Sequence, residues 1–202
     1  MKKLIVLCFA LFLLSVPALV FSSSCDSDAD PEYYVKFTLE DTEYLCSFGH
    51  PESDIDVPYA AVTTGILAQA SGEELIEFYG SSIETGANPE ELEFIVEVEG
   101  YLYVETPGTY TGTYSLEDIF NSVWVWIYSD DIWYPYMTSS GTVTIDAFNE
   151  IGGSVEGSFN ATFILSGDSI LPLDIGDEPQ TITGTFRVKR VSEEDLPEFI
   201  FN

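Results

Sequence analysis

The stretch Val155–Leu165, VEGSFNATFIL, decides the fold class because apolar and polar residues alternate along it. Successive side chains of a strand point to opposite faces, so this alternation predicts a strand with one buried and one solvated face. The buried face would carry Val155, Phe159, Ala161, Phe163 and Leu165, and the solvated face Glu156, Ser158, Asn160 and Thr162. Strands that are dry on one face only are typical of antiparallel sheets.

The same alternation recurs in residues 91–98 and 141–147, and turn residues such as Gly, Pro, Asn and Asp interrupt the chain at regular intervals. Short, evenly spaced strands of this kind predict an all-β protein. We expect a single antiparallel β-sandwich with little helix, and barrel-like closure of the sheet is the alternative. One helical turn is expected within residues 193–199.

A glycine pattern occurs twice, in Val155–Ala161 and Ile182–Val188, as apolar, polar, Gly, Ser or Thr, Phe, polar, apolar. Residues 110–114 form a looser third copy. A glycine between two inward-facing apolar residues lets a neighbouring large ring lie over the backbone. The pattern therefore predicts ring-over-glycine packing, although ordinary strand chemistry is enough to explain the repetition.

The first 24 residues have the layout of a secretory signal peptide, with Lys2 and Lys3 before an apolar run and Pro17 before small residues. The apolar stretch 4–21 has 18 residues, close to the lower limit for a membrane span, so an uncleaved anchor is the alternative. Helix-breaking Pro17 argues against that alternative.

Residues 22–25, SSSC, follow the apolar run directly and resemble the cleavage and lipidation site of bacterial lipoproteins. The resemblance implies that Cys25 becomes an acylated N-terminus, although Ser22 stands where that family usually has leucine. The alternative is ordinary cleavage, which would leave Cys25 as a free thiol or as the partner of Cys46 in a disulfide. Cys46 alternates in phase with Tyr44, which predicts that it packs inward as a small hydrophobe.

These features divide the chain into four parts: a signal peptide at 1–24, an acidic tether with the lipidation cysteine at 25–31, a β-sandwich domain at 32–192 and a C-terminal tail at 193–202.

The charge of the chain is strongly negative, with 35 acidic residues and a formal net charge of −29. There is no lysine or arginine between Phe37 and Phe186. Such a surface repels phosphate backbones, which excludes nucleic acid as a partner, and it equally repels anionic membranes, which leaves an acyl chain as the membrane link. The acidity itself has three explanations, namely solubility, adaptation to high salt and binding of divalent cations.

Five strand-like segments together resemble a broad group of uncharacterised all-β lipoproteins from bacteria with an outer membrane. The segments are YYVKFTLEDTEYLCSF, PGTYTGTY, GTVTIDAF, GGSVEGSFNATF and TITGTFRVKR, at 33–48, 107–114, 141–148, 152–163 and 181–190. The resemblance implies a secreted sandwich domain without an established activity, lipid-anchored in the cell envelope at the outer membrane or cell surface. A secreted soluble protein is the alternative.

Catalytic and metal-binding motifs are few. The single histidine, His50, follows no nucleophile-elbow pattern and is expected on a solvent-facing turn. Residues 26–30 imitate the start of a calcium loop, but Pro31 and Phe37 replace the required glycine and glutamate. A weak calcium site remains a candidate in one loop, and no other cofactor is expected; the loop acids are Asp168, Asp174, Asp177 and Glu178.

The hairpin NSVWVWIYSDDIWYPYM, residues 121–137, holds all three tryptophans, and both of its faces are apolar. An even-length loop puts Trp133 beside Trp124 and Trp126, whereas an odd one puts Tyr134 and Tyr136 there. A loop longer than two residues is expected because the turn lacks glycine. The aromatic residues fill a core or form a platform for a glycan or a partner protein. The candidate ligand-binding residues are Trp124, Trp126, Tyr128, Trp133, Tyr134 and Tyr136.

The expected function is therefore a non-enzymatic binding module, exported and tethered through Cys25. A hydrolase that uses a pair of carboxylates is one alternative, because acids are too abundant to exclude such a pair. A structural envelope protein whose acidic surface binds divalent cations is the other.

Overall fold

A computed structural model of the chain describes residues 31–39, 42–51, 53–64, 74–84, 94–117, 121–129, 132–165 and 179–196. The chain divides into two compact units, Met1–Asp30 and Pro31–Asn202, and all of the described residues lie in the second. The lipidation candidate Cys25 and the four acids proposed for calcium lie outside the described residues.

The described residues form ten strands and one 3₁₀ turn, so the prediction of an all-β protein is confirmed. The helical turn expected near the C-terminus is this 3₁₀ turn, Glu193–Asp195. The strands are β1 Tyr34–Leu39, β2 Thr42–Cys46, β3 Tyr59–Thr63, β4 Glu74–Ser81, β5 Phe94–Val104, β6 Gly112–Ser115, β7 Ser122–Ser129, β8 Ile132–Phe148, β9 Ser154–Leu165 and β10 Gln180–Arg190. No helix in this part of the chain has the length and apolar character of a membrane span.

Seven of the strands close into a barrel in the order β10–β3–β4–β5–β7–β8–β9, and β1, β2 and β6 extend it. The expected plain antiparallel sandwich is wrong, because one edge of β10 pairs with two different strands and so closes the sheet into a barrel. Residues 183–187 of β10 pair with β1, and Lys189 and Arg190 then pair with β3 in parallel. Lys189 N donates to Pro58 O at 2.9 Å and Val191 N to Ala60 O at 2.9 Å, which extends this short ladder.

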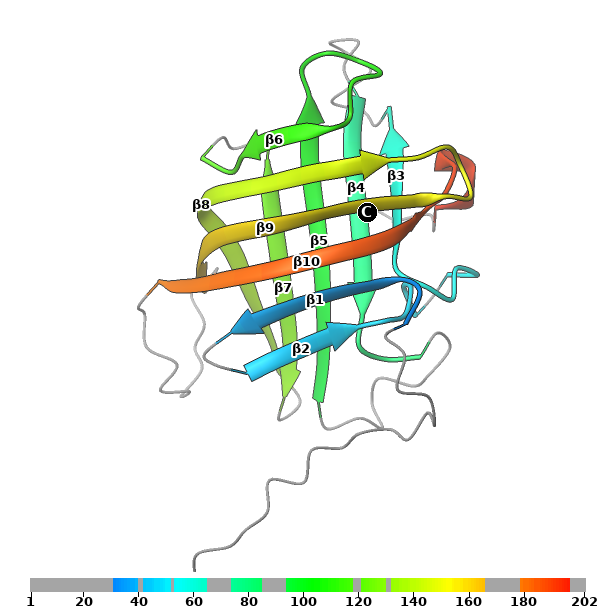
Figure 1. Cartoon of the computed structure of the whole chain (residues 1–202). Coiled ribbons are helices and arrows are strands. Elements are labelled where there is room, and N and C mark those ends of the chain that lie inside the picture. Colours follow the sequence, from blue (N-terminus) through cyan, green and yellow to red (C-terminus); the bar gives the residue numbers. More distant parts are fainter. Residues whose placement is uncertain are drawn as a thin grey trace, which may run out of the picture. The chain divides into compact units, whose positions relative to one another are not determined.

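Two crossing layers make up the barrel wall (Figure 1). Strands β3, β4, β5 and β7 run together in one layer, and β1, β2, β6, β9 and β10 run across them in the other. Strand β8 joins the two layers, because its first part pairs with β7 and its later part with β6. Register shifts at 138–140 and 145–147 mark irregularities of the kind that bend a long strand.

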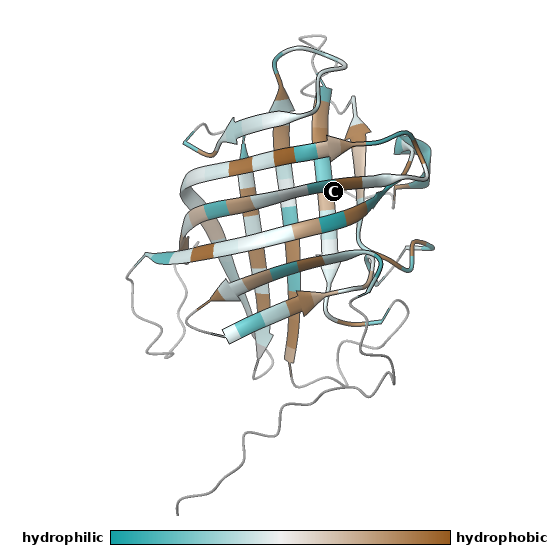
Figure 2. Cartoon of the chain, viewed as in Figure 1, coloured by the Kyte–Doolittle hydropathy of each residue, from teal (hydrophilic) through white to brown (hydrophobic). Residues whose placement is uncertain are grey.

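The core lies between the two layers, and hydrophobic residues alternate with polar ones along the strands (Figure 2). Ring-over-glycine packing is confirmed for both copies of the glycine pattern. Phe186 pairs with Gly157 and Phe159 with Gly184, and a Cβ on Gly157 or Gly184 would lie 2.5 Å or 2.3 Å from the facing ring. Gly112, in the looser third copy, has no such neighbour within 4 Å. The glycines therefore make room for two large aromatic side chains of this layer's inner face.

Cys46 is a free thiol buried in the same core, as its alternation with Tyr44 predicts. Its Sγ donates a long hydrogen bond of 3.6 Å to Val96 O. Burial raises the pKa of the thiol far above its usual range, so it is held neutral.

Candidate ligand-binding face

The aromatic hairpin is formed by β7 and β8, and Ser129 pairs with Ile132. Two residues therefore connect the strands, which is shorter than the expected loop. This even-length connection puts Trp133 opposite Tyr128, with ring centroids 5.2 Å apart. Val123 and Val125 face the core, so Trp124, Trp126 and Tyr128 point away from it.

The six candidate residues do not form one surface. Tyr134 and Tyr136 belong to the core cluster and are only 3% and 4% exposed. Trp133 is 37% exposed on the opposite face, where Trp124, Trp126 and Tyr128 are half-buried. The structure thus separates four outward aromatic residues from two that stabilise the core.

Trp124 and Trp126 lie against each other with ring centroids 5.7 Å apart and planes inclined by 15°. Nearly parallel rings at this separation form an offset stack. Each indole therefore covers part of one face of the other, so the two rings do not lie side by side as one flat binding surface.

Carboxylates from β5 and β4 lie beside these aromatic residues on the same outer face. In the β5–β7 ladder Glu97 pairs with Trp126 and Glu99 with Trp124. Glu77 of β4 pairs with Tyr101 of β5. We call this surface the acidic aromatic face; its residues are Tyr59, Glu77, Tyr79, Glu97, Glu99, Tyr101, Trp124, Trp126, Tyr128 and Trp133.

Partial burial changes the acidity of the three carboxyl groups. It raises the pKa of Glu77 and of Glu97 from 4.5 to about 7, and the nearby charge of Glu99 adds to both shifts. Burial also raises the pKa of Glu99, whereas the donors Trp126 and Tyr101 favour its charged form. Near neutral pH Glu77 and Glu97 therefore exchange protons instead of carrying fixed charges.

Tyrosine hydroxyls surround these acids. Tyr101 Oη donates to Glu99 Oε2 at 3.4 Å. Tyr59 and Tyr79 stack with ring centroids 5.7 Å apart, and they are 0% and 1% exposed. Their hydroxyls, like Trp126 Nε1, are buried and make no hydrogen bond of good geometry to the described residues. Tyr79 nevertheless lies close enough to Glu97 to favour the charged carboxylate, so its hydroxyl faces the acids.

One end of the face is covered by a loop and by the C-terminal segment. Ile55 and Leu196 pack against the cluster of Tyr59, Ala61, Tyr79 and Val191, which lies on the outer side of the sheet. The ring of His50 lies 5.1 Å from that of Tyr79 and is half-buried, so the expected solvent-facing histidine is wrong. The loop brings His50 onto the sheet because Phe48 forms a bridge with Ser81 of β4.

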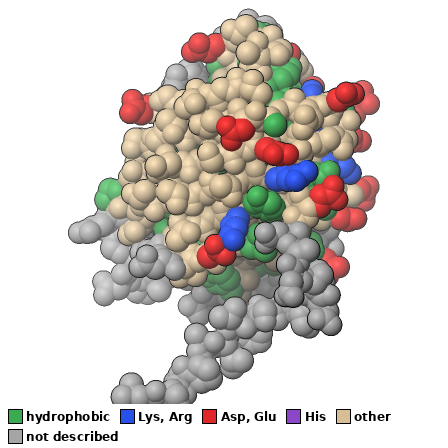
Figure 3. All heavy atoms as spheres, in the orientation of Figure 1, with side chains coloured by type: hydrophobic (Ala, Val, Ile, Leu, Met, Phe, Trp, Pro, Cys, Tyr) green, Lys and Arg blue, Asp and Glu red, His purple; other side chains and the backbone are tan. Residues whose placement is uncertain are grey.

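The described basic residues lie on β1 and β10 and not on β4 or β5, which carry the three carboxylates. Blue side chains are visible in Figure 3 on the side where β1 and β10 lie. Lys36 Nζ lies 3.1 Å from Glu43 Oε2, and Arg187 Nε lies 3.5 Å from Glu156 Oε1. Arg190 lies with its guanidinium carbon 4.5 Å from the centre of the Phe148 ring. Lys189 pairs with Tyr59 in the ladder. Hydrogen bonds from Ser192 lower the pKa of Asp195, and the charge of Lys189 adds to this shift.

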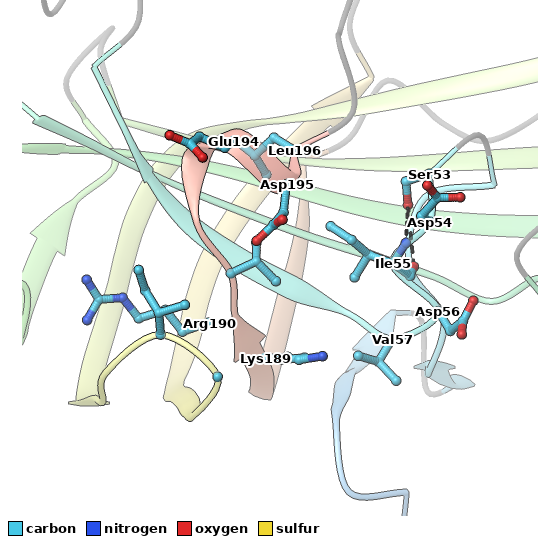
Figure 4. A pocket seen from close by; sticks show the side chains of 13 residues that line it. Ser53, Asp54, Ile55, Asp56, Val57, Lys189, Arg190, Glu194, Asp195 and Leu196 are labelled. Atoms are coloured by element: carbon cyan, nitrogen blue, oxygen red, sulfur yellow. Dashed lines mark hydrogen bonds between the residues drawn. The ribbon is translucent and has the colours of Figure 1, made fainter.

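A pocket of about 730 Å³ is lined partly by the same covering loop and C-terminal segment (Figure 4). Its polar lining carries charges of both signs, including Asp54, Asp56, Lys189, Arg190 and Asp195. It shares Ile55, Val191 and Leu196 with the cover of the acidic aromatic face. The mixture of charges does not select a ligand of either sign.

No group of three or more His, Cys, Asp or Glu side chains among the described residues is arranged to hold a metal ion. The carboxylates of the acidic aromatic face therefore do not form a chelating site.

The sequence pointed to the aromatic half of this face and missed the acidic half. The alternation in residues 91–98 places Glu97 on the outward face of β5, but it does not show that this face is partly covered. Comparison with protein-family models, with curated proteins and with solved structures finds no match to this chain.

Proposed function

We propose that the acidic aromatic face binds a glycan and that the protein is a non-enzymatic binding module. The observation that carries this proposal is the union of four outward aromatic residues with three partly buried carboxylates on one sheet face. The core is complete without these side chains, since the inner face of the same strands is filled by other residues.

Sugars match both halves of the face. A pyranose ring has an apolar side that packs on aromatic rings, and tryptophan and tyrosine provide large apolar faces with polar edges. Its hydroxyl groups donate to carboxylates such as Glu97 and Glu99, and they accept from donors such as Trp126 Nε1. The described Trp126 Nε1 and Glu99 already lie close enough for the indole to favour the charged carboxylate.

The acids support binding more than hydrolysis. Glycosidases divide the work between a protonated carboxyl group and an ionised one, so their environments move the two pKa values apart. Here burial raises the pKa of Glu77 and of Glu97 alike, to about 7, so these two acids are not divided in that way. The pocket beside the covering segments contains none of the three acids.

The proposal predicts that the double variant Trp124→Ala, Trp126→Ala loses glycan binding. We expect affinity to fall by a factor of about 30 or more, because aromatic anchors dominate such interfaces. A glycan array followed by titration calorimetry measures this, and circular dichroism checks the fold. Because both indoles lie outside the core, the double variant should stay folded.

Phe94→Ala is the matched control, because Phe94 is an exposed aromatic residue of β5 that alternates with Glu97 and Glu99 onto the other side of the strand. Its ring stacks on Tyr44, 6.0 Å away. This control should bind as the wild type does. A wild type that binds no glycan, or a folded double variant that binds every wild-type ligand, would refute the proposal.

We also propose that the protein is exported to the cell envelope and held there by acyl chains on Cys25. The sequence of residues 22–25 and the run before it support this. Cells grown with a labelled fatty acid should incorporate label into the wild type but not into Cys25→Ala. The variant should also be absent from the membrane fraction, in which the wild type is found. Absence of label from the wild type would contradict the anchor.

A further inference from the structure

The carboxylates of the acidic aromatic face have no cation supplied by the strands around them. No lysine or arginine occurs between Phe37 and Phe186, so strands β2 to β9 and the segments between them contain none. The pKa shifts of Glu77, Glu97 and Glu99 arise from burial, from each other and from neutral donors. Strands β4, β5 and β7 therefore supply no positive group to this face, which a cationic ligand would complement.

The titratable groups that interact with the three acids are the hydroxyls of Tyr59 of β3, Tyr79 of β4 and Tyr101 of β5. His50 of the covering loop packs on the ring of Tyr79, and Lys189 at the end of β10 pairs with Tyr59, so both lie at the covered end of the face.

A metal ion does not fit this arrangement, because no described group of three acidic, histidine or cysteine side chains can coordinate one. An organic ammonium group needs no such coordination geometry, because its three N–H donors make separate hydrogen bonds to carboxylate oxygens. Organic ammonium groups are also attracted to the faces of tryptophan and tyrosine rings.

A buried donor adds a second requirement. Tyr59 is 0% exposed, and its hydroxyl has no hydrogen-bond partner among the described residues, whereas the Tyr79 hydroxyl lies close enough to Glu97 to favour the charged carboxylate. A buried donor without an acceptor costs about 1–3 kcal/mol, so the ligand should bring acceptor oxygens as well as positive charge. An alkylammonium ion has no acceptor and a neutral sugar has no charge, whereas an amino sugar has both.

We propose that the glycan bound on this face is an amino sugar whose free ammonium group is held by Glu77, Glu97 and Glu99. The proposal rests on glycan binding at the acidic aromatic face. It adds that a sugar hydroxyl or ring oxygen accepts from Tyr59, while the indoles of Trp124 and Trp126 contact the sugar ring.

The test is an array of matched oligosaccharides that differ only at one ring carbon, which carries an ammonium, an acetamido or a hydroxyl group. Triplets based on glucose, galactose and mannose are probed at pH 7 with the full chain. We expect the ammonium member of at least one triplet to bind about tenfold more tightly than its neutral partners. That difference should shrink as NaCl is added, because salt screens charge pairs.

The double variant Glu97→Gln, Glu99→Gln should bind the ammonium member no better than the neutral ones. Glu105→Gln, an exposed acid just beyond β5, removes a charge elsewhere and should leave the preference intact. If the double variant unfolds, the two single variants take its place.

The outcomes separate this inference from glycan binding itself. Equal binding of ammonium and neutral members, or a preference that survives in the glutamine variants, overturns the amino-sugar inference and leaves glycan binding standing. A wild type that binds no member of any triplet and no other glycan overturns both.

Discussion

At the scale of single residues, the carboxyl group of Glu97 makes the stability of the fold depend on pH. A carboxyl whose pKa is higher in the folded chain holds extra protons there, which stabilises the fold below the unfolded pKa. That stabilisation is lost as the pH rises from 4.5 through about 7. Glu97→Gln behaves as a protonated acid at every pH. We therefore expect its unfolding free energy to fall less across this range than that of the wild type, by about 2 kcal/mol.

Urea unfolding at a series of pH values measures this difference. Glu105→Gln is the control for the general effect of removing one negative charge, because its side chain is exposed. Parallel pH profiles of Glu97→Gln and the wild type would show that the carboxyl at position 97 titrates normally in the folded protein.

The sequence predicted which residues alternate but not which polar residues are buried. Glu97 stands outward from the core, as the alternation indicates, yet residues 48–51, 53–58 and 191–196 cover part of the outer face. These segments are distant from β5 along the chain, so no local pattern shows that they meet it. His50 was misplaced for the same reason, because its packing on Tyr79 depends on the bridge between Phe48 and Ser81.

At the scale of the strands, β9 and β10 are joined by two reciprocal contacts of phenylalanine with glycine. A methyl group on Gly184 would lie 2.3 Å from the Phe159 ring, and Lys36 O at 2.8 Å closes the other side. Neither neighbour is a flexible chain end. We expect Gly184→Ala to lower the unfolding free energy by about 2–3 kcal/mol, in the range for overpacked cores.

Thermal or urea unfolding of Gly184→Ala, Phe159→Leu and the double variant tests whether this contact is the cause. The smaller leucine leaves room for the methyl group, so the loss in the double variant should be less than the sum of the two single losses. Additive losses would assign the cost to the backbone of β10 and not to the ring.

The strands also show where the alternation of side chains no longer predicts which residues face the core. The glycine pattern predicted its own packing, because only one face of β9 and β10 is apolar. In the hairpin both faces are apolar, so the positions of Tyr134 and Tyr136 depended on the length of the loop. The barrel could not be distinguished from a sandwich, because closure depends on two residues, Lys189 and Arg190, pairing with β3.

At the scale of the whole molecule, the acidic residues repel one another over the entire chain, whose net charge is −29. Repulsion between exposed charges extends over about 10 Å in 0.1 M salt and about 3 Å in 1 M salt. The folded chain holds these charges closer together than the unfolded chain does, so screening stabilises the fold. The excess of acids should therefore make stability depend on salt.

We expect the Tm, measured by circular dichroism at pH 7, to rise by about 5 °C between 0.1 M and 1 M NaCl. A Tm that is constant or falls over this range would show that repulsion does not limit stability. CaCl2 at equal ionic strength separates screening from binding, because screening alone gives the same rise for both salts. A larger rise with CaCl2 that disappears in the variant Asp174→Asn, Asp177→Asn would locate a calcium site in that loop, whereas a larger rise that survives there would place the ion elsewhere.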